Sequence, residues 1–326
     1  MQRLCRNSIP SRRARYNLFS MNLRSSIFLF FSIVCLAFSL PASAADSSQT
    51  QPDAAYVKSF EQWKAKRIES LKQNWLPLAG LFWLKPGVNS FGSAPGNAVV
   101  FPKGPAQAGE FDLEGNQVTV KLLPQAHATI AGKPVATARL EPDTADHETV
   151  VAMQSLRFHV IVRGTRVGIR LKDVDSPAVR NFRGLTFFPL DPNYRVTARW
   201  EPSDGSKTVD IPDILGDVTH QRLTGTVVFQ LNGQELRLSD LSDDPSKGLF
   251  IVFNDPTSKT DTYPGGRFLD TDAPVNGMVV LDFNRAYNPP CVVTPYATCP
   301  MAPRENRLSM PIPVGEKFDR AAHEHR

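Results

Sequence analysis

Apolar positions recur at two different spacings along this chain, and each spacing predicts one kind of element. Between Tyr56 and Leu71 they recur every three to four residues, which predicts one amphipathic helix whose aromatic face packs on the core. After Trp75 they come in short runs that Gly, Pro and Asn-Gly interrupt, which is typical of β-strands. These runs are 99–101, 118–120, 156–162, 167–171, 227–231 and 249–253.

The clearest hairpin surrounds Asn232-Gly233, because this pair supplies the positive φ angles of a type I′ turn. No long run with helical spacing follows the first helix, so we predict an all-β fold with one N-terminal helix. The first domain is expected to be β-sandwich-like and the second an antiparallel β domain, either barrel or sandwich. The predicted bounds are 1–44 for a leader, 45–75 for a linker and the helix, 76–190 and 191–320 for the two domains, and 321–326 for a tail.

The first 44 residues have the order of a signal peptide. Six arginines precede an apolar run, 27–40, and a small-residue cleavage site ends at Ala44. The run is too short to span a bilayer, so no membrane span is expected once the leader is removed. Translation from Met1 and translation from Met21 both remain open, since each gives such a leader. The sequence therefore predicts a periplasmic or secreted protein.

The charge balance changes once the leader is set aside. The chain has a formal net charge of +5, and the leader contains six arginines and no lysine or acidic residue, so the remainder carries about −1. A near-neutral surface with both signs does not attract a phosphate backbone. We therefore expect no nucleic-acid partner, which leaves a small molecule or another envelope protein as the partner classes.

The stretch 262–316 concentrates the unusual residues of the chain, including a Gly-Gly-Arg turn and closely spaced prolines that rule out a helix. In a strand over 278–284, Asp282 and Asn284 share one face, and Val279, Leu281 and Phe283 share the other, which is expected to face the core. Arg267 would arrive from a preceding strand, with the reversal at 274–277. We predict that Arg267 pairs with Asp282 or Asn284 across this hairpin.

Two interpretations of this polar cluster stay open. In one, it fixes a ligand, and the protein is a periplasmic enzyme or small-ligand receptor with a pocket near Arg267, Asp282 and Asn284. In the other, the side chains pair and brace turns, and the protein is a non-catalytic binding or interaction module. The candidate ligand-binding residues are Arg267, Asp282, Asn284, Tyr287, Asn288 and Asn306.

The sequence offers no nucleophile with its base, no metal-ligand spacing and no phosphate-cradling loop, which favours the non-catalytic interpretation without deciding whether the protein is an enzyme. No metal and no cofactor are expected. The histidines before the tail stand alone, and the paired histidines of the tail lack a fixed frame. Asp173, Asp175, Asp270 and Asp272 are candidate general acids by composition, and we interpret each as a solvated loop carboxylate.

Cys291 and Cys299 are the two cysteines that remain after the leader. An even pair in an oxidising compartment predicts a disulfide. A metal site would need two further ligands that the sequence does not identify, and a redox-active pair usually has the tighter C-x-x-C spacing. We predict a structural disulfide, and the redox-active pair stays as the alternative.

Several motifs of the stretch 262–316 resemble the C-terminal signature of a widespread bacterial family known only as a domain of unknown function. They are GGRFL at 265–269, LDFNRAYNPPC at 281–291, CP at 299–300 and ENRL at 305–308. The resemblance extends more loosely upstream to about Phe60 and implies no activity.

Residues 88–115 are faintly similar to a forkhead-associated β-sandwich. Gly92-Ser93 stands where a phosphothreonine reader would show Gly-Arg, and no Ser-x-x-His follows. The resemblance therefore implies a sandwich and does not imply phosphopeptide binding.

Overall fold

A computed structural model describes residues 52–320 of the chain, and a helix opens this range. Helix α1 spans Ala54–Ser70 and continues as a π-helical turn, Leu71–Trp75. The Asp53 carboxylate caps α1 by accepting a hydrogen bond from the backbone N–H of Tyr56 at 2.9 Å. The predicted helix is confirmed, whereas the predicted leader and C-terminal tail lie outside the described residues.

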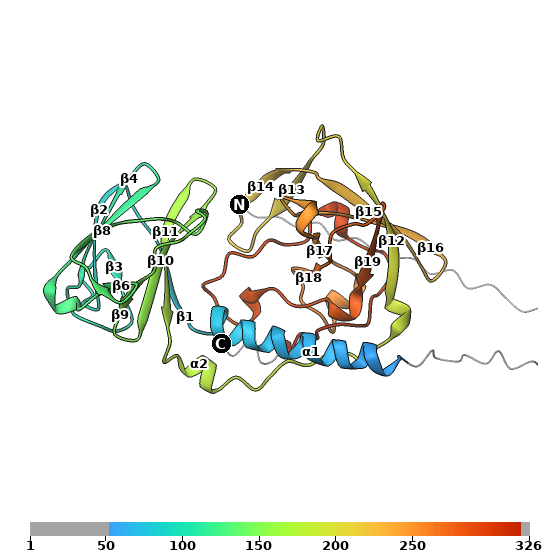
Figure 1. Cartoon of the computed structure of the whole chain (residues 1–326), viewed down its shortest axis with the longest axis horizontal. Coiled ribbons are helices and arrows are strands. Elements are labelled where there is room, and N and C mark those ends of the chain that lie inside the picture. Colours follow the sequence, from blue (N-terminus) through green and yellow to red (C-terminus); the bar gives the residue numbers. More distant parts are fainter. Residues whose placement is uncertain (1–51, 321–326) are drawn as a thin grey trace, which may run out of the picture. The chain divides into compact units, whose positions relative to one another are not determined.

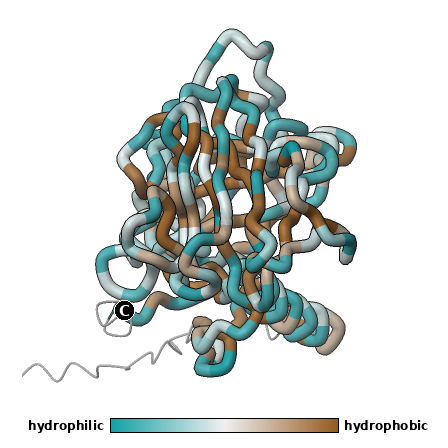
Figure 2. The backbone as a smooth tube through the Cα atoms, turned by 90° about the vertical axis from the view of Figure 1, so that its left-hand side faces the viewer, coloured by the Kyte–Doolittle hydropathy of each residue, from teal (hydrophilic) through white to brown (hydrophobic). Residues whose placement is uncertain are grey.

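Two sheets are built from the strands between α1 and residue 173. The first has the order β1-β11-β10-β9-β6-β7, with bounds Leu78–Trp83, Arg166–Asp173, Leu156–Arg163, Val151–Met153, Thr129–Ile130 and Lys133–Pro134. The second has the order β3-β2-β4-β5-β8, with bounds Val99–Val100, Gly87–Gly92, Gly109–Glu114, Gln117–Leu122 and Thr137–Leu140. Buried positions alternate with more exposed ones along strands such as β5. Figure 2 shows hydrophobic and hydrophilic residues intermixed along the chain.

These two sheets enclose one apolar core. Phe91 and Phe111 of the second sheet stack at 4.2 Å between ring centroids, and Phe158 of the first sheet meets both of them edge-on. Side chains from both sheets therefore interdigitate, as in a β-sandwich.

The strands after residue 194 form three further sheets (Figure 1). A four-stranded sheet has the order β16-β15-β12-β19, with bounds Gln234–Ser239, Gly225–Leu231, Arg195–Pro202 and Met278–Asp282. Two pairs accompany it, β13–β14 at Thr208–Pro212 and Val218–Arg222, and β17–β18 at Phe250–Phe253 and Arg267–Asp270. A short helix, α2 (Pro177–Arg180), precedes them. None of these sheets closes into a barrel, and the fold is all-β as predicted.

The predicted type I′ turn is confirmed between β15 and β16. Asn232 and Gly233 have φ angles of 49° and 76°, and the ladder on either side runs in register from Leu231–Gln234 to Thr226–Ser239. The sequence signal was sufficient here because the turn depends on two adjacent residues alone.

The predicted hairpin between Arg267 and Asp282 is wrong. β18 pairs with β17 and β19 pairs with β12, so the two strands belong to different sheets. The register places Arg267 opposite Phe253, which directs its side chain towards Asp255. Arg267 therefore pairs with neither Asp282 nor Asn284.

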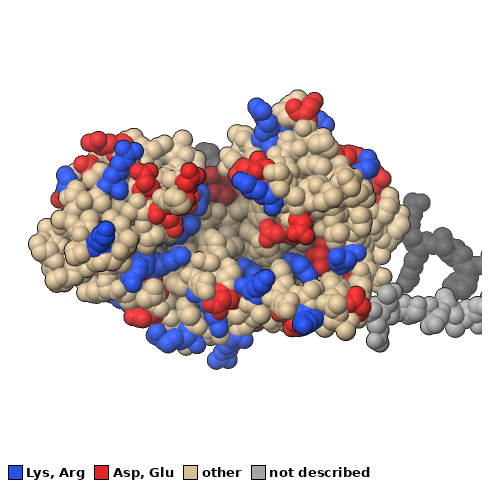
Figure 3. Space-filling model, viewed as in Figure 1, with Lys and Arg blue, Asp and Glu red and all other residues tan. Residues whose placement is uncertain are grey.

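Basic and acidic side chains are intermixed on the face shown in Figure 3, where neither sign forms a continuous field. Within residues 52–320, none of the helices combines the length and the apolar character needed to cross a membrane.

Candidate functional site

The guanidinium of Arg267 is enclosed by the protein and bound on several sides. Its Nη2 lies 2.8 Å from Oδ2 of Asp255, and each of the two side chains is 1% exposed. It also donates hydrogen bonds to the backbone carbonyl oxygens of Ile312, at 2.9 Å, and Val314. Asp255 in return accepts from the backbone N–H of Ile312 at 3.1 Å. The pair thus fixes the backbone near the C-terminal end of the described chain.

Two of the candidate asparagines also form hydrogen bonds with backbone groups of distant elements. Asn306 donates from Nδ2 to the carbonyl oxygens of Ser239 and Val252, at 2.8 and 3.0 Å. Asn284 exchanges two hydrogen bonds with the backbone of Asp191, at 2.9 and 2.8 Å. Residues 283–320 contain no β-strand, so these amides supply partners that a sheet ladder would otherwise provide.

Asp282 and Asn284 lie together as predicted, although β19 ends at Asp282 and Asn284 lies in the 3₁₀ turn Phe283–Arg285 that follows. Asn284 Nδ2 donates to Asp282 Oδ1 at 3.3 Å, and the hydroxyl of Tyr56 in α1 donates to the same oxygen at 2.8 Å. Arg285 forms an ion pair with Asp282 at 3.2 Å. The Asp282 carboxylate therefore ties α1 to the end of β19.

Tyr287 is the candidate residue that reaches a cavity walled by aromatic side chains. The cavity has a volume of about 350 Å³ and lies between α1, β17 and β18. We call it the aromatic cavity. It is lined by Trp63, Trp75, Phe250, Phe268 and Tyr287, together with Lys66, Arg67, Ser70, Asp270 and Pro290. Four of the five aromatic side chains are only partly buried, so part of each remains accessible.

Asp270 supplies the carboxylate of the aromatic cavity. Its Oδ2 accepts a hydrogen bond from the Tyr287 hydroxyl at 2.7 Å, and the residue is exposed at the end of β18. Nearby protein atoms remove part of its hydration and so raise the pKa of Asp270, although the Tyr287 hydroxyl and Arg67 oppose this. Burial raises the pKa of Tyr287 as well. Asp270 is exposed as expected, but it lies at a strand end and is hydrogen-bonded there.

Arg67 connects the aromatic cavity to a buried carboxylate. Its guanidinium lies 4.5 Å from the Tyr287 ring centroid, donates to the Asn288 carbonyl at 2.7 Å and lies 3.6 Å from Glu316. Glu316 also accepts from Nδ2 of Asn288 at 3.0 Å. Burial nevertheless raises the pKa of Glu316, so its charge depends on these two partners.

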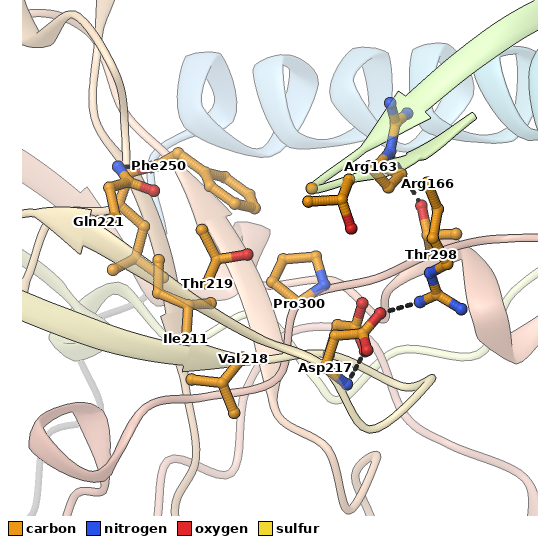
Figure 4. A pocket seen from close by; sticks show the side chains of 14 residues that line it. Arg163, Arg166, Ile211, Asp217, Val218, Thr219, Gln221, Phe250, Thr298 and Pro300 are labelled. Carbon is orange, nitrogen blue, oxygen red and sulfur yellow. Dashed lines mark hydrogen bonds and ion pairs between the residues drawn. The ribbon is translucent and has the colours of Figure 1, made fainter. Parts of the chain in front are cut away.

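A second cavity, of about 590 Å³, lies between the β10–β11 hairpin and the β13–β14 pair (Figure 4). Its charged walls are already paired: Arg166 forms an ion pair with Asp217, and Arg163 Nε donates to the Thr298 hydroxyl at 3.1 Å. Phe250 lines this cavity as well as the aromatic cavity, and among the described residues it is the one aromatic side chain that lines it. We take the aromatic cavity as the candidate site because five aromatic side chains line it.

The structure holds Cys291 and Cys299 side by side as thiols. The backbone N–H of Cys291 lies 3.3 Å from the Cys299 sulfur, and the Cys291 sulfur lies 3.5 Å from the Tyr263 hydroxyl. The predicted disulfide is not formed in this structure, and it stays a prediction.

Sequence reasoning missed most of this site. The aromatic face of α1 was expected to pack on the core, which holds for Phe60, whereas Trp63 is only partly buried at the aromatic cavity. Trp63 and Arg67 stand one helical turn apart, and that spacing was the available signal. The sequence contained no signal for Asp255, because its partner Arg267 is determined by the pairing of β17 with β18.

The family model described as "Protein of unknown function (DUF1684)" matches residues 180–317. An uncharacterized protein of Haloarcula marismortui, solved by NMR, is 31% identical; the match covers 44% of this chain and 82% of that chain, with a TM-score of 0.37. An FHA domain, solved in a study of phosphothreonine-dependent FHA interactions, is 17% identical over 28% of this chain and 92% of its own, with a TM-score of 0.20. No curated protein matches the chain.

Replacing Asp255 by Ala should lower the free energy of unfolding by about 3–5 kcal/mol, because the Arg267 guanidinium would then stay buried without its counter-ion. Urea denaturation of the purified protein measures this loss. The double variant Arg267→Met, Asp255→Leu should lose less than the single variant, since it leaves no uncompensated charge. Glu61→Ala, which removes an exposed pair with Lys64, serves as the control and should cost about 0–1 kcal/mol. A similarly small loss for Asp255→Ala would contradict the structural role of the pair.

Proposed function

We propose that this chain, which belongs to the family of proteins of unknown function described as DUF1684, is an exported, non-catalytic module. Its proposed ligand is a small saccharide, bound in the aromatic cavity. The observation that carries this proposal is the combination of partly exposed aromatic rings with one open carboxylate in a cavity of about 350 Å³. Ligand pockets usually measure about 300–1,000 Å³, so this cavity suits a ligand of one or two rings.

The aromatic walls favour a ligand with a flat apolar face. Trp63 belongs to α1, Trp75 follows it, and Phe250 and Tyr287 come from the part of the chain after residue 194, so the rings approach the cavity from different elements. The C–H face of a pyranose ring packs on such surfaces, and its hydroxyl groups can bond polar side chains at the edge. The carboxylate of Asp270 and the hydroxyl of Ser70 supply those partners.

The charges in the cavity do not favour a cationic ligand. Arg67 is already paired with Glu316, which leaves Lys66 against the carboxylate of Asp270. These two charges balance, so a cationic ligand would gain little beyond a cation–π contact of about 0.5–2 kcal/mol. A neutral saccharide suits this balance.

The lining residues support binding rather than hydrolysis. Glycoside hydrolysis usually needs two carboxyl groups on either side of the scissile bond. Among the described residues that line the aromatic cavity, Asp270 is the one carboxylate. Its bond from Tyr287 suits it to orient a ligand hydroxyl.

Export rests on the sequence. The arginine-rich start, the apolar run 27–40 and the cleavage site that ends at Ala44 have the order of a secretory signal. A periplasmic or extracellular location would bring the protein into contact with envelope glycans, which agrees with the proposed ligand class.

Saccharide binding should quench or shift the tryptophan fluorescence, because two of the four tryptophans line the cavity. Titration with N-acetylglucosamine and glucose disaccharides, followed by calorimetry, measures the affinity. Trp63→Ala should weaken binding by about tenfold or more, which corresponds to the roughly 1.4 kcal/mol expected for a lost aromatic platform. Asp270→Asn should weaken it with little change in packing.

Trp83→Ala is the matched control, since Trp83 lies in β1 beneath Arg166 and does not line the aromatic cavity. It should bind like the unmodified protein. Choline is the control ligand and should not bind. Saccharide binding that survives Trp63→Ala unchanged, or choline binding tighter than that of every saccharide tested, would contradict the proposal.

The mature protein should begin at Ala45 or Asp46. N-terminal sequencing of protein recovered from the periplasmic fraction or the medium tests this expectation. Recovery of the intact leader on cytoplasmic protein would refute export.

A further inference from the structure

The two thiols of Cys291 and Cys299 differ in exposure although they adjoin each other. The backbone N–H of Cys291 lies 3.3 Å from the Cys299 sulfur. Cys299 is buried, with 4% of its surface exposed, whereas Cys291 is partly exposed. Solvent can therefore reach one sulfur of the pair more readily than the other.

The surroundings of Cys291 favour its thiolate. Its sulfur lies 3.5 Å from the Tyr263 hydroxyl, which donates to it once the thiol has lost its proton. The hydrogen bond with the Cys299 thiol contributes most to lowering the pKa of Cys291, and the Tyr263 hydroxyl lowers it further. The same contact with Cys291, together with burial, raises the pKa of Cys299. A thiolate is the attacking form of cysteine, so Cys291 is the nucleophile of the pair.

Arg170 places a positive charge near the buried sulfur. Its side chain in β11 is 7% exposed, and its Nε has no hydrogen-bond partner among the described residues. Among the described residues its guanidinium makes no direct ion pair, and the carboxylates of Asp143 and Glu148 offset only part of the burial that lowers its pKa. Its charge lowers the pKa of Cys299, so a Cys299 thiolate would be stabilised beside it.

We propose that Cys291 and Cys299 form a redox-active dithiol that exchanges with an exposed disulfide of a substrate. The bond predicted from the sequence is its oxidised form, and the reversible reaction is the new assignment. The proposal is independent of saccharide binding.

The reaction has two steps. The Cys291 thiolate attacks one sulfur of a substrate disulfide, R–S–S–R; that bond breaks, a mixed disulfide forms on Cys291, and R–S⁻ leaves. Cys299 then loses its proton, and its thiolate attacks the Cys291 sulfur. The Cys291–Cys299 disulfide forms as the second R–S⁻ leaves. The protein dithiol gives up two electrons and two protons, which convert the substrate disulfide into two thiols.

A metal site is the weaker assignment for this pair. Structural zinc is bound by four ligands, and among the described residues no group of three or more His, Cys, Asp and Glu side chains is placed to hold a metal. A purely structural disulfide leaves the unequal exposure, the Tyr263 contact and the buried charge of Arg170 without a role.

Equilibration of the full chain with mixtures of reduced and oxidised glutathione tests reversibility. Alkylation followed by peptide mass spectrometry reads Cys291 and Cys299 separately from the leader cysteines. The disulfide should pass from mostly oxidised to mostly reduced within the range that these mixtures set. A bond that stays oxidised in reduced glutathione alone would show a structural disulfide and overturn the proposal, as would a pair that never oxidises.

The order of reaction is tested on the reduced protein near neutral pH. Iodoacetamide should modify Cys291 roughly tenfold or more faster than Cys299 in the unmodified chain, which needs no variant to fold. With oxidised glutathione, Cys299→Ala should accumulate a mixed disulfide on Cys291, and Cys291→Ala should accumulate none on Cys299. Arg170→Met should slow closure of the Cys291–Cys299 bond while leaving the alkylation rate of Cys291 near its original value. Equal alkylation rates for the two thiols would overturn the assignment of Cys291 as nucleophile.

Discussion

The salt bridge between Arg267 and Asp255 is the contact on which the C-terminal half depends. It joins β18 to the turn after β17 and, through the carbonyl groups of Ile312 and Val314, to the last part of the described chain. A buried ion pair is more stable when its remaining donors and acceptors also find partners. Here the backbone of the final segment supplies them for Nη1 and Nη2 of Arg267, whereas its Nε has no partner among the described residues. The charge pair and the path of that segment therefore stabilise each other.

The segment 283–320 follows an irregular path because side chains replace the ladder of a sheet. Asn284 and Asn306 bind backbone groups of distant elements, and Asn288 binds Glu316. Such a segment can change direction without the constraint of a sheet, but its buried polar groups then need hydrogen-bond partners from side chains. This arrangement presents the Tyr287 ring to α1, where it completes the aromatic cavity. The same loop brings Cys291 back to Cys299.

Local patterns predicted the elements but not the partners. Asn232-Gly233 defined a turn by itself, and the alternation at 278–284 correctly placed Val279, Leu281 and Phe283 on the buried face. The partner of Arg267 depended on which strands pair across a long sequence separation, and no local pattern encodes that choice. The proposed site is built in the same way, since Trp63 and Asp270 are more than two hundred residues apart. An aromatic side chain on a helix face looks the same in sequence whether it meets a core or a cavity.

Native-state hydrogen exchange on the Asp255→Asn variant tests most directly whether the buried pair organises this half of the protein. The substitution keeps the shape of the side chain and removes its charge. We predict faster exchange at the backbone amides of Phe268, Tyr287 and Ile312, because the segment they fix would open locally. Amides of β10 and β11 should exchange as before, since they belong to the first sheet. Unchanged exchange throughout the C-terminal half, or equal acceleration in both halves, would contradict the account.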